Sequence, residues 1–148
     1  MSTYILFNAK IITPFITIDS GFIILTGKKI RFVGNHFLDG LMFEAERRDA
    51  DNQFDREGKT LLPGYIDIHT HGALGKDYSS SPDLVFEDSQ FRASKGVTGF
   101  LPTIGCFVPP ESMFASAKLL SSYLDQPMKG AKPLGLNMEG PFLHPDLG

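Results

Sequence analysis

The sequence predicts an α/β protein in which a small β-sandwich-like domain (residues 1–60) precedes a series of parallel βα units (residues 61–148). Two observations support this fold class. Short β-rich runs separated by turn residues fill the first 33 residues, and apolar strands alternate with segments of helical period after Pro63. The chain has 148 residues, 42% of them hydrophobic, so it is long enough to bury a core.

The β-rich runs of the N-terminal part predict a small antiparallel sheet. Turn residues separate them at Pro14, at 19–21 and at 26–29, and the last of these is the clearest hairpin signal. The runs are residues 4–7, 10–12, 15–18, 22–25 and 30–33. Charged residues dominate from Glu44 to Lys59, which predicts a surface segment that leaves the sheet and a domain boundary at residues 57–62.

After Pro63, three apolar runs predict parallel strands at residues 65–69, 97–101 and 134–138. Two helices are expected between them. Ser81-Pro82-Asp83 has the pattern of an N-cap, an N1 proline and a first-turn acid, and predicts a helix that ends at Gly96. The second helix is expected to begin at Glu111, because its apolar positions recur at steps of four, three and four. Those positions are Met113, Ala117, Leu120 and Leu124.

Composition and charge exclude several classes of function. The formal net charge is only -3 and the basic residues come in short groups, so the sequence predicts no nucleic-acid partner. Cys106 is the sole cysteine, which excludes an intramolecular disulfide and favours a cytoplasmic location. No signal peptide and no uninterrupted apolar span of about 18 residues is evident, so no membrane association is expected.

The main candidate site is the His-x-His pair formed by His69 and His71. Side chains alternate faces along a strand and advance about 3.3 Å per residue, so the two imidazoles can reach a common ion, with Asp67 on the same face. Such a pair also occurs by chance on protein surfaces. Here, however, it ends a predicted strand, where parallel α/β barrels form their active sites, and Gly72 leaves room for a ligand near the backbone.

Glu139 has a similar place at the end of the third predicted strand, before Gly140-Pro141. Its carboxylate could ligate a metal beside the imidazoles, or it could be a solvated loop acid or the partner of a nearby cation. Pro102-Thr103, at the end of the second predicted strand, could shape the same site, although a strand-terminating turn explains them equally well. Two imidazoles and a carboxylate suit zinc, iron or manganese, so the metal is predicted only as divalent.

Three motifs in this order resemble the N-acetylglucosamine-6-phosphate deacetylases of the amidohydrolase superfamily. They are Pro-Gly-Tyr-Ile-Asp-Ile-His-Thr-His-Gly (63–72), Gly-Val-Thr-Gly-Phe-Leu-Pro-Thr (96–103) and Leu-Asn-Met-Glu-Gly-Pro-Phe (136–142). The first motif would also suit dihydroorotases and allantoinases. The combination of Leu-Pro-Thr with Glu-Gly-Pro-Phe is similar to the deacetylases in particular.

This resemblance implies a metal-dependent hydrolase whose catalytic domain is a (β/α)8 TIM barrel, incomplete in this chain. By the resemblance, His69, His71 and Glu139 bind a divalent metal. The implied reaction is hydrolysis of the N-acetyl group of N-acetylglucosamine 6-phosphate to glucosamine 6-phosphate and acetate, in amino-sugar catabolism. The partner is then a small-molecule substrate, and the full-length protein is expected to be a homodimer.

The resemblance also predicts residues that the 148 positions do not supply. Two further metal-binding histidines and the general-base aspartate are expected beyond Gly148, and a barrel of this class needs about 250 residues. His144 and Asp146 follow the last matched motif and are not candidates to replace them. The chain alone is therefore expected to be an inactive N-terminal fragment. Two alternatives remain: another amidohydrolase acting on cyclic amides, or a truncated, non-catalytic relative that binds a metal or a partner.

Overall fold

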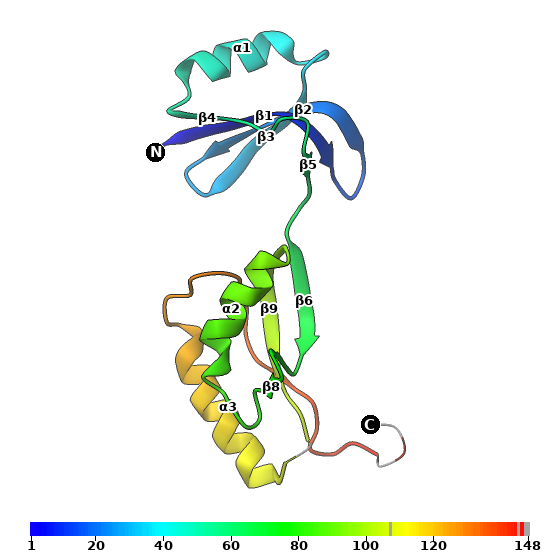
Figure 1. Cartoon of the computed structure of the whole chain (residues 1–148), viewed down its shortest axis with the longest axis vertical. Coiled ribbons are helices and arrows are strands. Elements are labelled where there is room, and N and C mark those ends of the chain that lie inside the picture. Colours follow the sequence, from blue (N-terminus) through cyan, green and yellow to red (C-terminus); the bar gives the residue numbers. More distant parts are fainter. Residues whose placement is uncertain (107, 145, 147–148) are drawn as a thin grey trace. The chain divides into compact units, whose positions relative to one another are not determined.

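The computed structural model describes residues 1–106, 108–144 and 146 and shows an α/β architecture (Figure 1). The contacts between residues divide the chain into two compact units, Met1–Pro63 and Gly64–Gly148. None of the three helices in the described residues combines the length and the apolar character that a membrane crossing requires.

The first unit is built on one five-stranded sheet. Its strands are β1 (Thr3–Ile12), β2 (Thr17–Thr26), β3 (Lys29–Asn35), β4 (Asn52–Asp55) and β5 (Thr60–Leu61). The first three are antiparallel neighbours, but β4 and β5 pair with β1 in parallel. The antiparallel sheet predicted for the first 33 residues is therefore confirmed, and β4 and β5, which were not predicted, extend it in parallel. A parallel neighbour needs a crossover connection, and helix α1 (Gly40–Asp49) supplies it.

The predicted turn at residues 19–21 is wrong, because β2 continues through it. Gly21 pairs with Ala9 where the register of β1 shifts, and a Cβ at Gly21 would lie 2.6 Å from Cδ1 of Ile11. This glycine permits a close side-chain contact within the sheet. The predicted hairpin at 26–29 is confirmed, with Thr26 opposite Lys29 and Gly27 at a φ of 58°.

Helix α1 occupies part of the charged segment that was predicted to run over the surface. Phe43 is its one buried residue, and it packs into a core cluster with Ile5, Phe22 and Ile24. The guanidinium carbon of Arg47 lies 4.4 Å from the centre of the Phe7 ring. The helix is held by one buried aromatic residue and one cation–π contact. It therefore has no apolar residues repeating at helical spacing, and the sequence shows only a weak helical period.

The second unit is organised around one central strand. Its elements are β6 (Tyr65–Thr70), β7 (Gly72–Ala73), β8 (Lys76–Asp77), α2 (Leu84–Ser94), β9 (Val97–Ile104), α3 (Pro110–Leu124), β10 (Lys132–Pro133) and β11 (Asn137–Met138). Strand β9 pairs in parallel with β6 and with both β10 and β11. Strands β7 and β8 form a separate short hairpin after β6.

Two strand predictions in this unit need correction. The third predicted strand is two short strands, β10 and β11, separated by residues 134–136, where Gly135 has a φ of 158°. Strand β9 extends to Ile104 and so includes Pro102 and Thr103, which excludes a strand-terminating turn there. Pro102 lacks an N–H, and the strand accommodates it opposite Thr70, whose own N–H donates to Thr103 Oγ1.

Helices α2 and α3 both pack against β9 and form the core of this unit with it (Figure 1). The spacing predicted for the second helix is confirmed at Met113, Ala117 and Leu120, all buried. In contrast, β6 leaves Ile66 and Ile68 exposed. Helices α2 and α3 thus cover β9, while β6 presents apolar side chains to solvent.

Tyr78 is fully buried and donates its hydroxyl hydrogen bond to Asp88 Oδ2. Burial, and next the hydrogen bond to Asp88, raise the pKa of Tyr78. Because an unfolded tyrosine ionises near pH 10, the stabilisation from Tyr78 is complete below about pH 10 and is lost as the pH rises above it. We expect Tyr78→Phe to lower the free energy of unfolding by about 1–2 kcal/mol at pH 7 and by less at pH 10.5.

Urea denaturation at the two pH values measures this difference. Tyr4→Phe, in the first unit, is the matched control. Its difference from the wild-type protein in free energy of unfolding should be the same at both pH values. An equal loss of stability for Tyr78→Phe at both pH values would contradict the expectation.

Candidate metal centre

Strand β6 positions the two histidines. His69 lies within it and His71 follows its last residue, Thr70. The backbone N–H of Thr70 donates to Thr103 Oγ1 at 3.0 Å, which fixes this strand end to β9. As the two-residue period requires, the imidazoles lie on one side, and their Nε2 atoms are 3.3 Å apart.

Glu139 comes to the same place from the other side of β9. It follows β11, and its N–H donates to the Ile104 carbonyl at 2.9 Å. Asn137 Nδ2 donates to Thr103 Oγ1 at 3.2 Å. The Thr103 hydroxyl oxygen, fully buried, therefore accepts one hydrogen bond from each neighbouring segment and sets their relative position.

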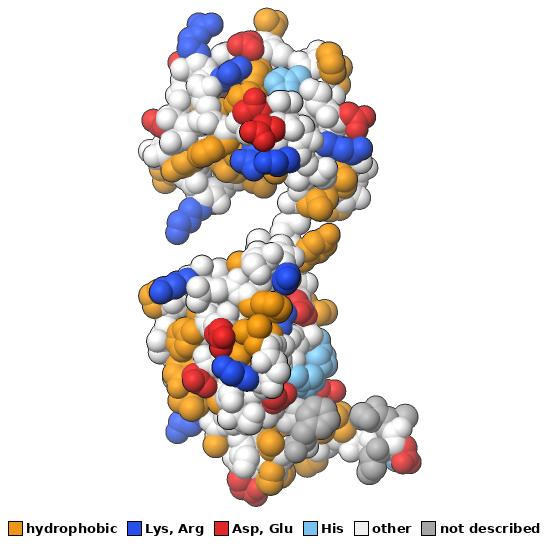
Figure 2. All heavy atoms as spheres, in the orientation of Figure 1, with side chains coloured by type: hydrophobic (Ala, Val, Ile, Leu, Met, Phe, Trp, Pro, Cys, Tyr) orange, Lys and Arg blue, Asp and Glu red, His pale blue; other side chains and the backbone are white. Residues whose placement is uncertain are grey.

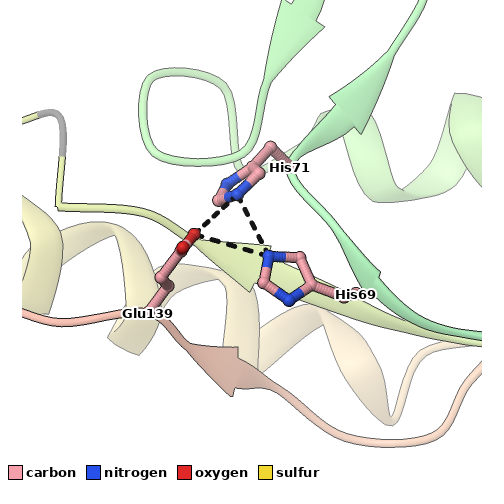
Figure 3. Close-up of side chains that lie close together, drawn as sticks. All are labelled: His69, His71 and Glu139. Carbon is pink, nitrogen blue, oxygen red and sulfur yellow. Dashed lines mark hydrogen bonds and ion pairs between the residues drawn. The ribbon is translucent and has the colours of Figure 1, made fainter. Parts of the chain in front are cut away.

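The three side chains converge on one point (Figure 3). Glu139 Oε2 lies 2.8 Å from His71 Nε2 and 3.4 Å from His69 Nε2. Ligand atoms about 2.1 Å from a metal ion lie about 3.0 Å apart at octahedral angles and about 3.4 Å apart at tetrahedral angles. The distances between the three ligand atoms therefore match those between neighbouring ligands of one metal ion. The donor types suit a divalent transition metal.

The group is open to solvent on one side. The side chains of His69, His71 and Glu139 are 51%, 31% and 28% exposed. Histidine side chains are visible at the surface of the second unit in Figure 2. An ion held here would keep positions accessible to water and to a small molecule, as hydrolytic metal sites require.

Asp67 takes a different role from the one its place on the strand indicated. Its Oδ2 accepts from Arg92 Nη1 at 2.6 Å and its Oδ1 accepts from the His69 N–H at 3.2 Å. The carboxylate is therefore bound to a cation and to backbone, not directed at the three ligand atoms. His144 and Asp146 pair with one another at 3.8 Å and do not join the group.

Arg92 is the residue near this site that sequence reasoning missed. It is almost buried and contacts Asp67, Thr70 and Gly72, which are 20 to 25 residues away along the chain. The one local signal was its spacing of four from Asp88, which is typical of an ion pair along a helix.

No family model matches the chain. Among curated proteins it is similar to the N-acetylglucosamine-6-phosphate deacetylases of Mus musculus and Homo sapiens, each 38% identical over 116 residues. It is also similar to the N-acetylgalactosamine-6-phosphate deacetylase of Escherichia coli O157:H7, 33% identical over 92 residues. The matches cover 74% of this chain but 28% of the mouse and human proteins, and 62% and 24% for the bacterial one.

Solved structures give the same relationship. The N-acetylglucosamine-6-phosphate deacetylase of Pasteurella multocida is 25% identical with a TM-score of 0.69, and the match covers 97% of this chain and 36% of that one. The Mycobacterium smegmatis deacetylase, 20% identical, has a TM-score of 0.71 over 97% of this chain and 34% of that one, and supports the fold alone. The predicted fold class, an α/β chain that holds part of a larger catalytic domain, is confirmed.

Proposed function

This chain corresponds to the N-terminal part of the N-acetylglucosamine-6-phosphate deacetylases, and on that premise we propose that it supplies the metal site of such an enzyme. In the full-length protein, the proposed reaction is hydrolysis of the N-acetyl amide of N-acetylglucosamine 6-phosphate to glucosamine 6-phosphate and acetate. The convergence of His69, His71 and Glu139 is the observation that supports this proposal most directly.

The donor set suits this chemistry. Two imidazole nitrogens and one carboxylate leave a divalent ion with a net charge of about +1, so it stays electrophilic. A divalent metal bound here would supply Lewis acidity toward the amide carbonyl and toward water. Zinc, iron and manganese all accept these ligands. The residues themselves hold the ligand atoms at the carboxyl ends of β6 and β11, on the solvent-accessible side.

We assign the activity to the full-length protein and not to these 148 residues alone. The chain spans 28% of the length of the mouse and human relatives that it matches. The general base, the further metal ligands and the groups that bind the sugar phosphate are proposed to lie in the remainder. A second candidate substrate is N-acetylgalactosamine 6-phosphate, because the Escherichia coli relative that carries this name is 33% identical.

Metal removal tests the proposal. The full-length protein is treated with a chelator, and acetate release is measured before and after addition of Zn²⁺, Fe²⁺ or Mn²⁺. We expect activity on N-acetylglucosamine 6-phosphate to fall at least about 100-fold without metal and to return with one of the three ions, because the ion provides the electrophile. The isolated 148-residue chain is the control and should release no acetate with any ion.

The same assay separates the alternatives. N-acetylgalactosamine 6-phosphate and a cyclic amide, dihydroorotate, are tested at equal concentration. Turnover of the cyclic amide without release of acetate from either sugar would contradict the deacetylase assignment. Activity that persists after complete metal removal would contradict the role of His69, His71 and Glu139.

A further inference from the structure

We propose that Arg92 is a positioning residue that sets the separation of His69 and His71 for metal binding, an inference that rests on the proposed metal site. Arg92 lies on α2, and its guanidinium donates to Asp88 on the same helix and to Asp67, Thr70 and Gly72. It acts through the backbone segment that carries both histidines.

The Arg92 guanidinium joins three parts of the second unit. Nε donates to Asp88 Oδ2 at 2.7 Å within α2, and Nη1 donates to Asp67 Oδ2 at 2.6 Å in β6. Nη2 donates to Thr70 Oγ1 and to the Gly72 carbonyl, the latter at 3.2 Å. The side chain is only 10% exposed, so these bonds face little competition from water.

These contacts bracket both histidines. Asp67 precedes His69 by two residues and also accepts its N–H, Thr70 lies between the two histidines, and Gly72 follows His71 directly. A planar group with donors at fixed angles therefore holds the backbone before, between and after the two ligands.

The position of the guanidinium is itself fixed. Its carbon lies 5.2 Å from the centre of the buried Phe100 ring, and Asp88, fully buried, also accepts the Tyr78 hydroxyl. Two carboxylates, those of Asp67 and Asp88, surround one guanidinium. This network therefore carries one net negative charge next to the segment that holds the histidines, which favours a cation there.

A lysine at position 92 would keep the charge but could not reproduce the set of contacts. Its single ammonium group is a point charge without the fixed fork of the guanidinium. If Arg92 only neutralises the charges of Asp67 and Asp88, Arg92→Lys should bind metal as the wild-type protein does. If Arg92 positions the segment that carries the histidines, Arg92→Lys should bind metal more weakly. The substitution therefore separates the two roles.

The test is Co²⁺ binding to the metal-free full-length protein, with the visible absorption of the bound ion as a second readout. We expect Arg92→Lys to raise the Kd for Co²⁺ about 10- to 100-fold, the range typical for groups that orient metal ligands, and to change the absorption bands. Ser89→Ala is the matched control, because it removes a buried hydrogen bond of the same helix, to the Ala131 carbonyl, and none to Arg92, Asp67, Thr70 or Gly72. It should lower thermal stability and leave the Kd within about twofold.

A second pair of variants covers the case in which Arg92→Lys does not fold. Thr70→Val keeps the shape of the side chain but removes one of the two acceptors of Arg92 Nη2, and Thr70→Ser keeps the hydroxyl. Only Thr70→Val should weaken Co²⁺ binding, by several-fold.

Two outcomes count against the inference, and they can be distinguished. Wild-type affinity and absorption in Arg92→Lys, or in Thr70→Val when Arg92→Lys does not fold, would overturn the positioning role and leave the metal site intact. Failure of the wild-type protein to bind Co²⁺ would overturn the proposed metal site and, with it, this inference.

Discussion

Glu139→Gln is expected to reduce deacetylation by the full-length protein at least about 100-fold and to weaken metal binding by at least as much. Removal of a group that only orients a ligand costs about 10- to 100-fold in metal affinity, and loss of a direct ligand should cost no less. Glu139 supplies the one carboxylate among the three converging side chains. Glutamine keeps the length and shape of the side chain but offers a neutral amide oxygen, so of the three converging side chains only the two imidazoles would remain as strong ligands.

Isothermal titration with Zn²⁺ and the acetate-release assay measure the two effects. Glu111→Gln is the matched control, since Glu111 is an exposed acid in the first turn of α3 and the charge change is the same. Near wild-type activity in Glu139→Gln, with Glu111→Gln also active, would show that Glu139 does not bind the metal. Equal losses in both variants would point to a general effect of charge and contradict the assignment.

Local sequence patterns were enough to place the candidate site residues at the ends of strands. The two-residue period of a strand placed His69 and His71 on one face, and the end of an apolar run placed Glu139 nearby. The resemblance to the deacetylases then assigned all three as metal ligands. The structure brings these three side chains together through β9, which pairs with both strands. The carboxyl ends of parallel strands lie at the same edge of a sheet, so residues at those ends can be predicted to lie close together.

Contacts between distant residues account for what the sequence did not reveal at this site. The bonds from Arg92 to Asp67 and Thr70 cross more than 20 positions, and no periodicity encodes them. Asp67 was placed with the histidines by alternation alone, but its partner on α2 binds it instead. An ion pair between elements can thus override the face that a strand pattern assigns.

The fold errors have equally local causes. The apolar run at residues 134–138 has the composition of a strand, but Gly135 interrupts it. Gly21 resembles a turn residue, yet it permits close packing against Ile11. Helix α1 has Phe43 as its one buried residue, which is too little to give a helical period. In each case the local sequence was compatible with both the predicted and the observed structure, and packing against the rest of the unit determined which one formed.

Gly72→Ala is expected to lower the free energy of unfolding by at least about 3 kcal/mol and to abolish metal binding. The sequence suggested that Gly72 leaves room for a ligand, but the structure indicates a different reason for glycine. Its φ of 149° disfavours any other residue, and an added Cβ would lie 2.2 Å from the Lys76 carbonyl oxygen. Because Gly72 pairs with Asp77 in the β7–β8 hairpin, relief of this overlap would displace the backbone next to His71.

Gly75→Ala separates backbone strain from this overlap. Gly75 lies in the same hairpin at a φ of 74°, but a Cβ there meets nothing within 4 Å, so its cost should be about 1–2 kcal/mol with metal binding retained. Urea denaturation and Co²⁺ titration of both variants measure the difference. If Gly72→Ala were no more destabilising than Gly75→Ala and still bound Co²⁺, the hairpin would be able to relax without moving His71. The position of His71 would then depend on β6 and Arg92, and closure of the β7–β8 hairpin would have no part in it.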